Sequence, residues 1–221
     1  MRPFNEYGVI IFDCDGVIPD SNTLKIDAMR NALKESAITS VEVDECTSFF
    51  SDNFGKSRFY HIDYFVDNLL GIERAAIDNF KRNLLASYSK QCKSLYLFAK
   101  TTPFITELLT QTSAIKYVAS GSEQQELRDV FLTRKLHCYF KEILGSPEKK
   151  VNHVTHILAK NVALEAVMIG DAISDLEAAK KNNIDFIFYR LLSNVEEKMS
   201  ELCLQFGYRI IDSFEEVLKE L

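Results

Sequence analysis

The chain has 221 residues, 47% hydrophobic and 26% charged, a composition typical of globular proteins. The net charge of −6 and the pI near 5.3 argue against binding to nucleic acid or to an anionic membrane surface. No apolar run approaches the roughly 18 residues of a membrane span, and the N-terminus carries no apolar signal segment, so we expect a soluble, cytoplasmic protein.

The first predicted element is the apolar run Val9–Phe12, which is followed by Asp13, Asp15 and Gly16. Such a run is typical of a buried parallel strand, and open α/β sheets bind ligands beyond the carboxyl ends of such strands. Two carboxylates this close repel each other unless a cation or a shared proton is present. Mg²⁺ fits, because it takes oxygen ligands and commonly bridges carboxylates to a phosphate. An ordinary Asp-Gly turn is the alternative interpretation.

The region that follows shows helical spacing and no convincing strand. The predicted helices are Asn22–Ser36, Asp44–Phe49, Arg58–Leu70, Glu73–Ser94 and Pro103–Thr110. We interpret residues 18–97 as an inserted helical cap domain and residues 1–17 and 98–221 as a discontinuous core. Seven aromatic residues are expected to pack inside the cap rather than to stack on a ligand. They are Phe49, Phe50, Phe54, Phe59, Tyr60, Tyr64 and Phe65.

From residue 115 onward, strand-like and helix-like segments alternate. The predicted strands are Ile115–Ser120, Tyr139–Leu144, Ala166–Ile169, Asp185–Tyr189 and Tyr208–Ile211. The predicted helices between them are Glu123–Leu136, Val151–Leu164, Leu176–Asn183 and Asn194–Phe206. This alternation predicts βαβ units. The expected fold class is therefore α/β, with a Rossmann-like parallel sheet covered by helices on both faces and an inserted α-helical cap.

Residues suited to binding phosphate follow two of these segments. Ser120 and Gly121 come at the end of a strand, where a hydroxyl and exposed backbone amides can hold a phosphate oxygen. The alternative is that Ser120 or Ser122 only begins a helix. Lys149 and Lys150 can bring a cation to a phosphate, although a lysine pair is also common on a solvated surface.

A second acidic group follows the predicted strand Ala166–Ile169, where Asp171 and Asp175 come after Gly170. These residues place two more carboxylates at a strand end. Asp175 can alternatively cap a helix. The five cysteines are odd in number and form no Cys-x-x-Cys pair, which argues against a disulfide framework or a zinc site. Cys14 is expected to pack in the core.

Taken in order, these segments resemble the haloacid dehalogenase-like (HAD) superfamily of phosphohydrolases. The first motif is Asp13-Cys14-Asp15-Gly16 with the trailing Asp20-Ser21, and the second is Ser120. The third is a lysine at 149 or 150, with Lys150 preferred because it directly precedes a helix, and the fourth is Gly170-Asp171-x-x-x-Asp175. An inserted helical cap is also a trait of this family. The resemblance spans the whole chain.

The resemblance implies a role for each motif. Asp13 would be the nucleophile that forms an aspartyl-phosphate, and Asp15 would be first a general acid and then a general base. The implied ligands of Mg²⁺ are Asp13, Asp171, Asp175 and the main-chain carbonyl of Asp15. The implied phosphate-binding residues are Ser120, Gly121 and Lys150. HAD dehalogenases proper lack the second aspartate, so the presence of Asp15 argues against dehalogenation.

The function implied is a Mg²⁺-dependent phosphatase acting on a small phosphorylated metabolite, such as a phosphosugar or a phosphorylated acid. The loop Phe54–Arg58 resembles the cap loop that faces the catalytic crevice, and we expect Arg58, and secondarily Lys56, to bind an anionic group of the substrate. Solvated cap charges are the alternative, and His61 is a weaker candidate. A phosphosugar mutase and a catalytically silent HAD-fold interaction protein remain alternative functions. Either a monomer or a homodimer is expected.

Overall fold

The computed structural model describes residues 2–221 and contains a six-stranded, all-parallel sheet. Its strands are β1 (Val9–Phe12), β2 (Ile115–Glu123), β3 (Glu142–Ser146), β4 (Ala166–Gly170), β5 (Asp185–Tyr189) and β6 (Arg209–Ile211). The spatial order is β3-β2-β1-β4-β5-β6, so β1 lies between β2 and β4. All four β1 residues are buried, as their apolar side chains predict.

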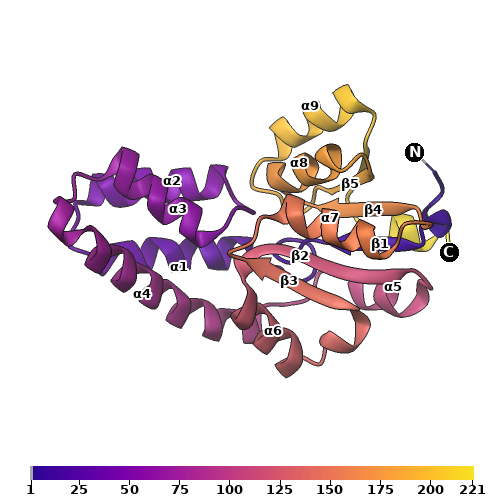
Figure 1. Ribbon diagram of the computed structural model, residues 1–221, viewed down its shortest axis with the longest axis horizontal. Coiled ribbons are helices and arrows are strands. Elements are labelled where there is room, and N and C mark those ends of the chain that lie inside the picture. Colours follow the sequence, from indigo (N-terminus) through magenta and orange to yellow (C-terminus); the bar gives the residue numbers. More distant parts are fainter. Residues whose placement is uncertain (1) are drawn as a thin grey trace.

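Helices cover both faces of the sheet, which confirms the predicted fold class (Figure 1). One face packs against α5 (Ile105–Gln111), α6 (Gln124–Thr133) and α10 (Glu215–Leu218). The other face packs against α7 (Lys150–Lys160), α8 (Ile173–Lys181) and α9 (Glu196–Phe206). Because successive strand residues point to opposite faces, Ile10 and Phe12 belong to the first apolar cluster and Val9 and Ile11 to the second.

Four helices lie beside the sheet rather than on its faces (Figure 1). They are α1 (Asn22–Lys34), α2 (Ser40–Asp52), α3 (Arg58–Tyr64) and α4 (Ile77–Phe98), with a π-helical turn at Phe65–Leu69 and a 3-10 turn at Arg74–Ala76. Six of the seven aromatic residues contact another ring of the group, as the stacked rings of Phe49 and Tyr64, with centroids 3.7 Å apart, illustrate. We call this helical group the cap and the sheet with its covering helices the core.

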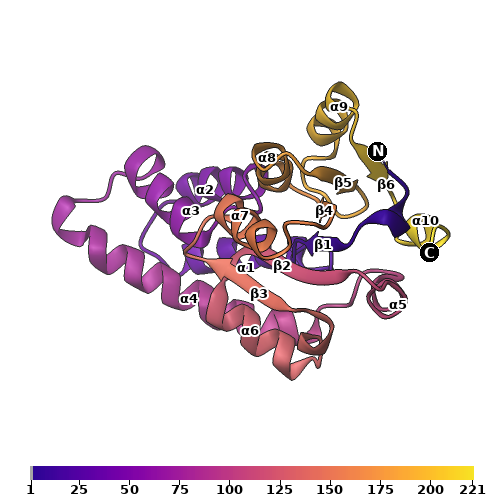
Figure 2. The ribbon, with the colours of Figure 1, turned by 45° about the vertical axis from the view of Figure 1, so that its right-hand side comes forward.

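The two chain segments that connect the cap to the core run next to each other. Pro19 and Thr101 form an isolated antiparallel bridge, and the amide of Thr102 donates to the carbonyl of Ile18 at 2.9 Å. The chain ends lie on the side of the sheet remote from the cap (Figure 2). The exact limits of the cap, residues 18–97, stay a prediction.

Some element bounds differ from those expected. The predicted strand Tyr139–Leu144 begins at Glu142, because Tyr139 lies in a 3-10 turn. Strand β2 continues through Ser120 and Gly121 to Glu123, with a register irregularity after Ala119. Within residues 2–221, we find no helix with the length and apolar character needed to cross a bilayer.

Candidate active site

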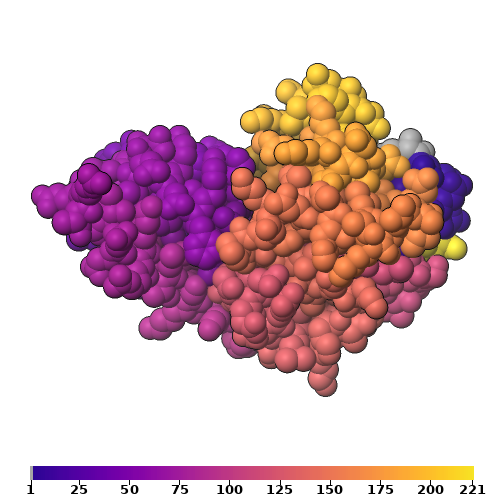
Figure 3. All heavy atoms as spheres, in the orientation of Figure 1, coloured from indigo at the N-terminus to yellow at the C-terminus, as the bar shows by residue number. Residues whose placement is uncertain are grey.

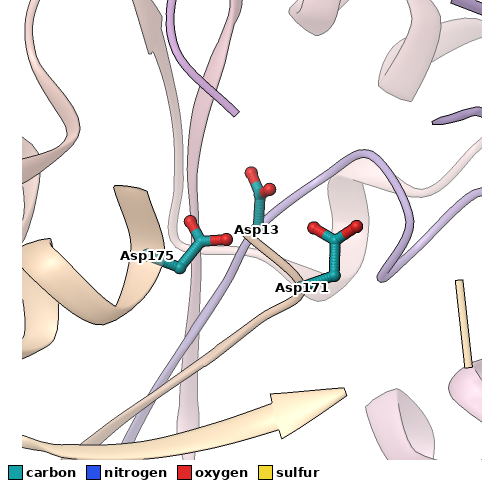
Figure 4. A group of neighbouring side chains, drawn as sticks. All are labelled: Asp13, Asp171 and Asp175. Atoms are coloured by element: carbon teal, nitrogen blue, oxygen red, sulfur yellow. The ribbon is translucent and has the colours of Figure 1, made fainter. Parts of the chain in front are cut away.

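Three buried carboxylates meet at the carboxyl ends of β1 and β4. Asp13 directly follows β1, Asp171 directly follows β4, and Asp175 lies in the first turn of α8. Carboxylate oxygens of the three residues lie within 4.8 Å of one another (Figure 4). Because β1 and β4 are adjacent and parallel, the residues after them share one sheet edge, and the Asp13 amide donates to the Ile169 carbonyl at 2.9 Å.

The tight turn after β1 brings the side chain of Asn22 close to the three carboxylates. Gly16 has a φ of +73°, and a Cβ at this position would collide with the Asp171 carboxylate and the Asn22 amide. Asn22, the first residue of α1, donates from Nδ2 to Asp171 Oδ2 at 2.5 Å. Glycine is therefore required here both by its backbone conformation and by close approach.

Lys150 supplies the positive charge inside this group. Its Nζ lies 3.0 Å from Asp13 Oδ1 and also donates a short hydrogen bond to Asp175 Oδ1. Of the two lysines that sequence reasoning left open, Lys150 is buried in the site, whereas Lys149 is exposed. Asp175 uses its second oxygen to accept from the Ala172 amide at 3.0 Å.

The three buried carboxylates repel one another, and Lys150 alone does not compensate their negative charge. Burial, followed by the charge of Asp175, raises the pKa of Asp13 to about 7 despite Lys150. Burial, followed by the charges of Asp13 and Asp175, raises the pKa of Asp171 well above its ordinary value. Asp13 Oδ2 and Asp171 Oδ1 are buried and have no hydrogen-bond partner among residues 2–221. Unpartnered carboxylate oxygens in a buried anionic cluster fit a hard divalent cation such as Mg²⁺.

Asp15 faces a different set of partners. Its carboxylate accepts hydrogen bonds from Ser21 (2.6 Å), Tyr96 (2.7 Å), Lys25 (2.8 Å) and Ser122 (2.8 Å). Burial alone would raise the pKa of Asp15, but the Lys25 ammonium and these hydrogen bonds outweigh it, so the pKa is lowered. In this arrangement Asp15 is an ionised carboxylate whose oxygens are surrounded by donors.

Sequence reasoning missed the functional position of Lys25 and Tyr96. Lys25 lies one helical turn after Ser21, and its amide donates to the Ser21 carbonyl, so an i, i+4 search from the first motif could have found it. Ser122, considered only as a helix cap, lies two residues after Ser120 on β2. Tyr96, at the far end of α4, has no local sequence signal that links it to Asp15.

Two of the three expected phosphate-binding residues, Ser120 and Gly121, line a cavity between cap and core that Asp13 and Asp15 also line. Ser120 is buried, and its hydroxyl accepts from the Ser122 amide at 3.1 Å. A Cβ at Gly121 would collide with the carbonyl oxygens of Gly55 and Lys56, so the absence of a side chain lets the cap loop pack directly on β2.

The cavity between cap and core is small in this arrangement. It measures about 20 Å³ and its walls include Asp13, Asp15, Lys25, Arg58, His61 and Ser120. That volume accommodates about one water molecule. Figure 3 shows the cap atoms packed against the core atoms on the face in view. A molecule much larger than water does not fit in this cavity while cap and core are packed together in this way.

Both cap residues expected to select the substrate border this cavity. Arg58 is 4% exposed and donates two hydrogen bonds of 3.0 Å to Glu126 of α6. Lys56 is half-buried, and its Nζ lies 4.6 Å from the centre of the Tyr60 ring. Their role in substrate selection stays a prediction.

The chain matches known proteins over most of its length. The sequence profile described as "Haloacid dehalogenase-like hydrolase" matches residues 10–189. Among solved structures, a predicted phosphatase from Clostridium acetobutylicum has 20% sequence identity, covers 97% of both chains and superposes with a TM-score of 0.73.

Two further solved structures share the fold. A predicted phosphoglycolate phosphatase from Haemophilus somnus has 18% identity, 97% coverage of both chains and a TM-score of 0.71. A haloacid dehalogenase-like family hydrolase from Streptococcus pneumoniae has 18% identity, covers 97% of this chain and 98% of its own, and has a TM-score of 0.70. A search of curated proteins gives no significant match. The profile match, over more than half of the chain, shows that the protein belongs to the haloacid dehalogenase-like hydrolases.

Proposed function

We propose that the protein is a Mg²⁺-dependent phosphatase that hydrolyses a small phosphate monoester through an aspartyl-phosphate on Asp13. The observation that carries this proposal is the grouping of Asp13 with Lys150, Asp171 and Asp175 at one sheet edge, beside a cavity that Asp15 also borders. Two of the structures with the same fold are named as predicted phosphatases, which supports the same reaction class.

In the first step, an Asp13 oxygen attacks phosphorus and the bond from phosphorus to the ester oxygen breaks. Lys150 lies 3.0 Å from Asp13 Oδ1 and orients the carboxylate. Protonated Asp15 gives its proton to the departing ester oxygen, which leaves as an alcohol. In this closed arrangement Asp15 has a lowered pKa and is ionised, so it must take up this proton before or during substrate binding.

In the second step, Asp15 is again a carboxylate and removes a proton from a water molecule. The resulting hydroxide attacks the phosphorus of the aspartyl-phosphate, the bond from phosphorus to Asp13 breaks, and inorganic phosphate is released. Ser120, the Gly121 amide and Lys150 would hold the phosphoryl oxygens through both steps.

The metal would bind at Asp13 and Asp171, whose unpartnered oxygens lie in one buried cluster, together with the main-chain carbonyl of Asp15. Asp175 would support this site, because both of its oxygens already accept hydrogen bonds. When bound, Mg²⁺ supplies positive charge that favours ionised Asp13 and neutralises the phosphoryl oxygens.

The cap, residues 18–97, would open at the paired connections around Pro19 and Thr101 to admit the substrate and then close to exclude water. Arg58 and Lys56 would then lie close to the leaving group and influence which ester is accepted.

The direct test is phosphate release from a panel of phosphate monoesters with Mg²⁺ present. We expect multiple turnovers that stop on addition of EDTA and resume with excess Mg²⁺. A mutase would instead isomerise a sugar phosphate, respond to a bisphosphorylated sugar and release little inorganic phosphate. A silent interaction protein would release none from any ester, and either outcome would contradict the proposal.

Mg²⁺ should also stabilise the fold measurably, because it relieves repulsion among buried carboxylates. At 100 times the dissociation constant, binding adds about 2.7 kcal/mol, which raises the Tm of a chain of this size by about 5 to 10 °C. Asp171→Asn should lose this rise relative to its own metal-free Tm. The exposed Asp27→Asn on α1 is the matched control and should retain it. An unchanged rise in Asp171→Asn would place the metal elsewhere.

Asp13→Asn should lower phosphate release by at least about three orders of magnitude, because an amide of the same shape cannot attack phosphorus. Circular dichroism and thermal melting should show a folded protein. Asp27→Asn again serves as the control with full activity. If folded Asp13→Asn protein turned over at a substantial fraction of the wild-type rate, Asp13 could not be the nucleophile.

Asp15→Asn should lower kcat for alkyl phosphates by about 10²- to 10⁴-fold, the usual contribution of a positioned acid. The loss should be much smaller for p-nitrophenyl phosphate, whose leaving group departs without a proton. This variant should still bind Mg²⁺, because the main-chain carbonyl of residue 15 is unchanged. The Mg²⁺-dependent rise in Tm measures this binding. Equal losses with both kinds of ester would contradict the acid role.

A further inference from the structure

Arg58 and Glu126 form a buried ion pair that joins the cap to the core next to the cavity. Arg58 Nη1 and Nη2 each donate to a different Glu126 oxygen at 3.0 Å, and the side chains are only 3% and 4% exposed. Nη1 also donates to Ser89 at 2.6 Å, and the guanidinium lies 4.7 Å from the Tyr88 ring centre. The Nη1–Nη2 edge of the guanidinium, one of the edges that can bind a carboxylate, is therefore already occupied by a carboxylate of the protein.

A substrate with a second anionic group would have to compete for this guanidinium. If it displaced Glu126, a carboxylate would remain buried without its cation, which typically costs several kcal/mol. If Glu126 stayed, two anions would share one guanidinium in a region shielded from water, which is also unfavourable. A substrate with an uncharged leaving group allows the cap to close with the Arg58–Glu126 pair intact.

The other cations at the cavity do not offset this repulsion. Lys25 is buried and paired with Asp15 at 2.8 Å. Lys56 lines both the cavity and the groove outside it; its main-chain carbonyl faces Gly121, and its ammonium already contacts the ring of Tyr60, which lines the outer groove.

The rest of the cap wall is uncharged. Phe50, Phe54 and Tyr88 line the cavity together with His61, which is 1% exposed. Burial, followed by the nearby lysine charges, lowers the pKa of His61 to about 3, so the ring is neutral. Both ring nitrogens are buried and, within residues 2–221, neither has a side-chain hydrogen-bond partner, although the Lys56 main chain contacts the ring. A neutral imidazole offers one donor and one acceptor, which suits a hydroxyl group.

We propose that the substrate is a monoester of an uncharged, hydroxylated alcohol, and that Glu126 excludes esters with a second anion by neutralising Arg58. This inference rests on the proposed phosphatase function and names the substrate class for that site. It assigns Glu126 as a specificity-determining residue and His61 as the group that receives a substrate hydroxyl.

The test compares two esters that differ only at the end remote from phosphate. 2-Hydroxyethyl phosphate ends in a hydroxyl and phosphoglycolate ends in a carboxylate. We expect the wild-type kcat/KM to favour 2-hydroxyethyl phosphate by at least about tenfold. A wild-type preference for phosphoglycolate would overturn the inference while leaving the phosphatase function intact. Absence of phosphate release from both esters and from p-nitrophenyl phosphate would overturn the proposed function, and the inference with it.

Two substitutions at position 126 separate charge from shape. Glu126→Gln removes the negative charge and frees Arg58 for the substrate. The ratio of kcat/KM for 2-hydroxyethyl phosphate to kcat/KM for phosphoglycolate should then fall at least about tenfold. Glu126→Asp keeps the charge and should keep the wild-type preference. Lys90→Met on α4 serves as the matched control, because it removes an exposed cap lysine that does not line the cavity. A kcat/KM ratio that changes with Lys90→Met and not with folded Glu126→Gln would contradict the assignment.

A double variant covers the case in which Glu126→Gln does not fold. Arg58→Met combined with Glu126→Leu removes both charges and replaces the pair with apolar groups, a change that buried ion pairs often tolerate. We expect the preference to shrink toward equal rates for the two esters, because both the guanidinium and its carboxylate are gone. A selective loss of phosphoglycolate turnover would instead show that Arg58 binds the carboxylate of the substrate, and would overturn the inference.

Discussion

The need to balance negative charge at the carboxyl ends of β1 and β4 dominates this molecule. Asp13, Asp171 and Asp175 are at most 1% exposed, and Lys150 is the cation in contact with Asp13 and Asp175. Buried charges are costly unless they are paired, and one lysine cannot compensate three carboxylates. The cluster therefore fits a further cation, which the proposed phosphatase function would supply as Mg²⁺.

Two charged residues of the cap form ion pairs with carboxylates of the core. Lys25 pairs with Asp15, and Arg58 pairs with Glu126, so both contacts form only when cap and core meet. If the cap opened, each charged group would lose the attraction of its partner, which is unfavourable. Each group would also regain hydration, which is favourable, so the two free-energy changes would oppose each other. In the proposed opening of the cap, this balance would keep the free-energy cost small, and closure would depend on any charge that a substrate brings to the boundary between cap and core.

Much of the core could be predicted from the sequence because its signals are local. Apolar runs mark the strands, and the acidic residues and glycine after Val9–Phe12 mark the catalytic sheet edge. The choice of Lys150 over Lys149 needed the structure, because adjacent residues at a helix start differ only in where their side chains point. Lys25 was overlooked although it is one turn from Ser21. Tyr96 could not be found, because it meets Asp15 only after a long helix has folded back.

Arg58 shows most clearly why residue type alone does not decide function. An arginine in a cap loop indicates an anion receptor, and that expectation is sound for an isolated guanidinium. Glu126 lies 68 residues later in the chain, on a helix that covers the sheet, and nothing near either residue in the sequence connects them. Once paired, the two side chains together carry no net charge, so we expect them not to attract the anion that Arg58 alone would attract. The proposed catalytic residues Asp13 and Asp15 follow strand β1, and local sequence motifs predict them. In the proposed specificity mechanism, substrate choice depends on the contact between cap and core, so a substitution on either side would change it without altering any motif.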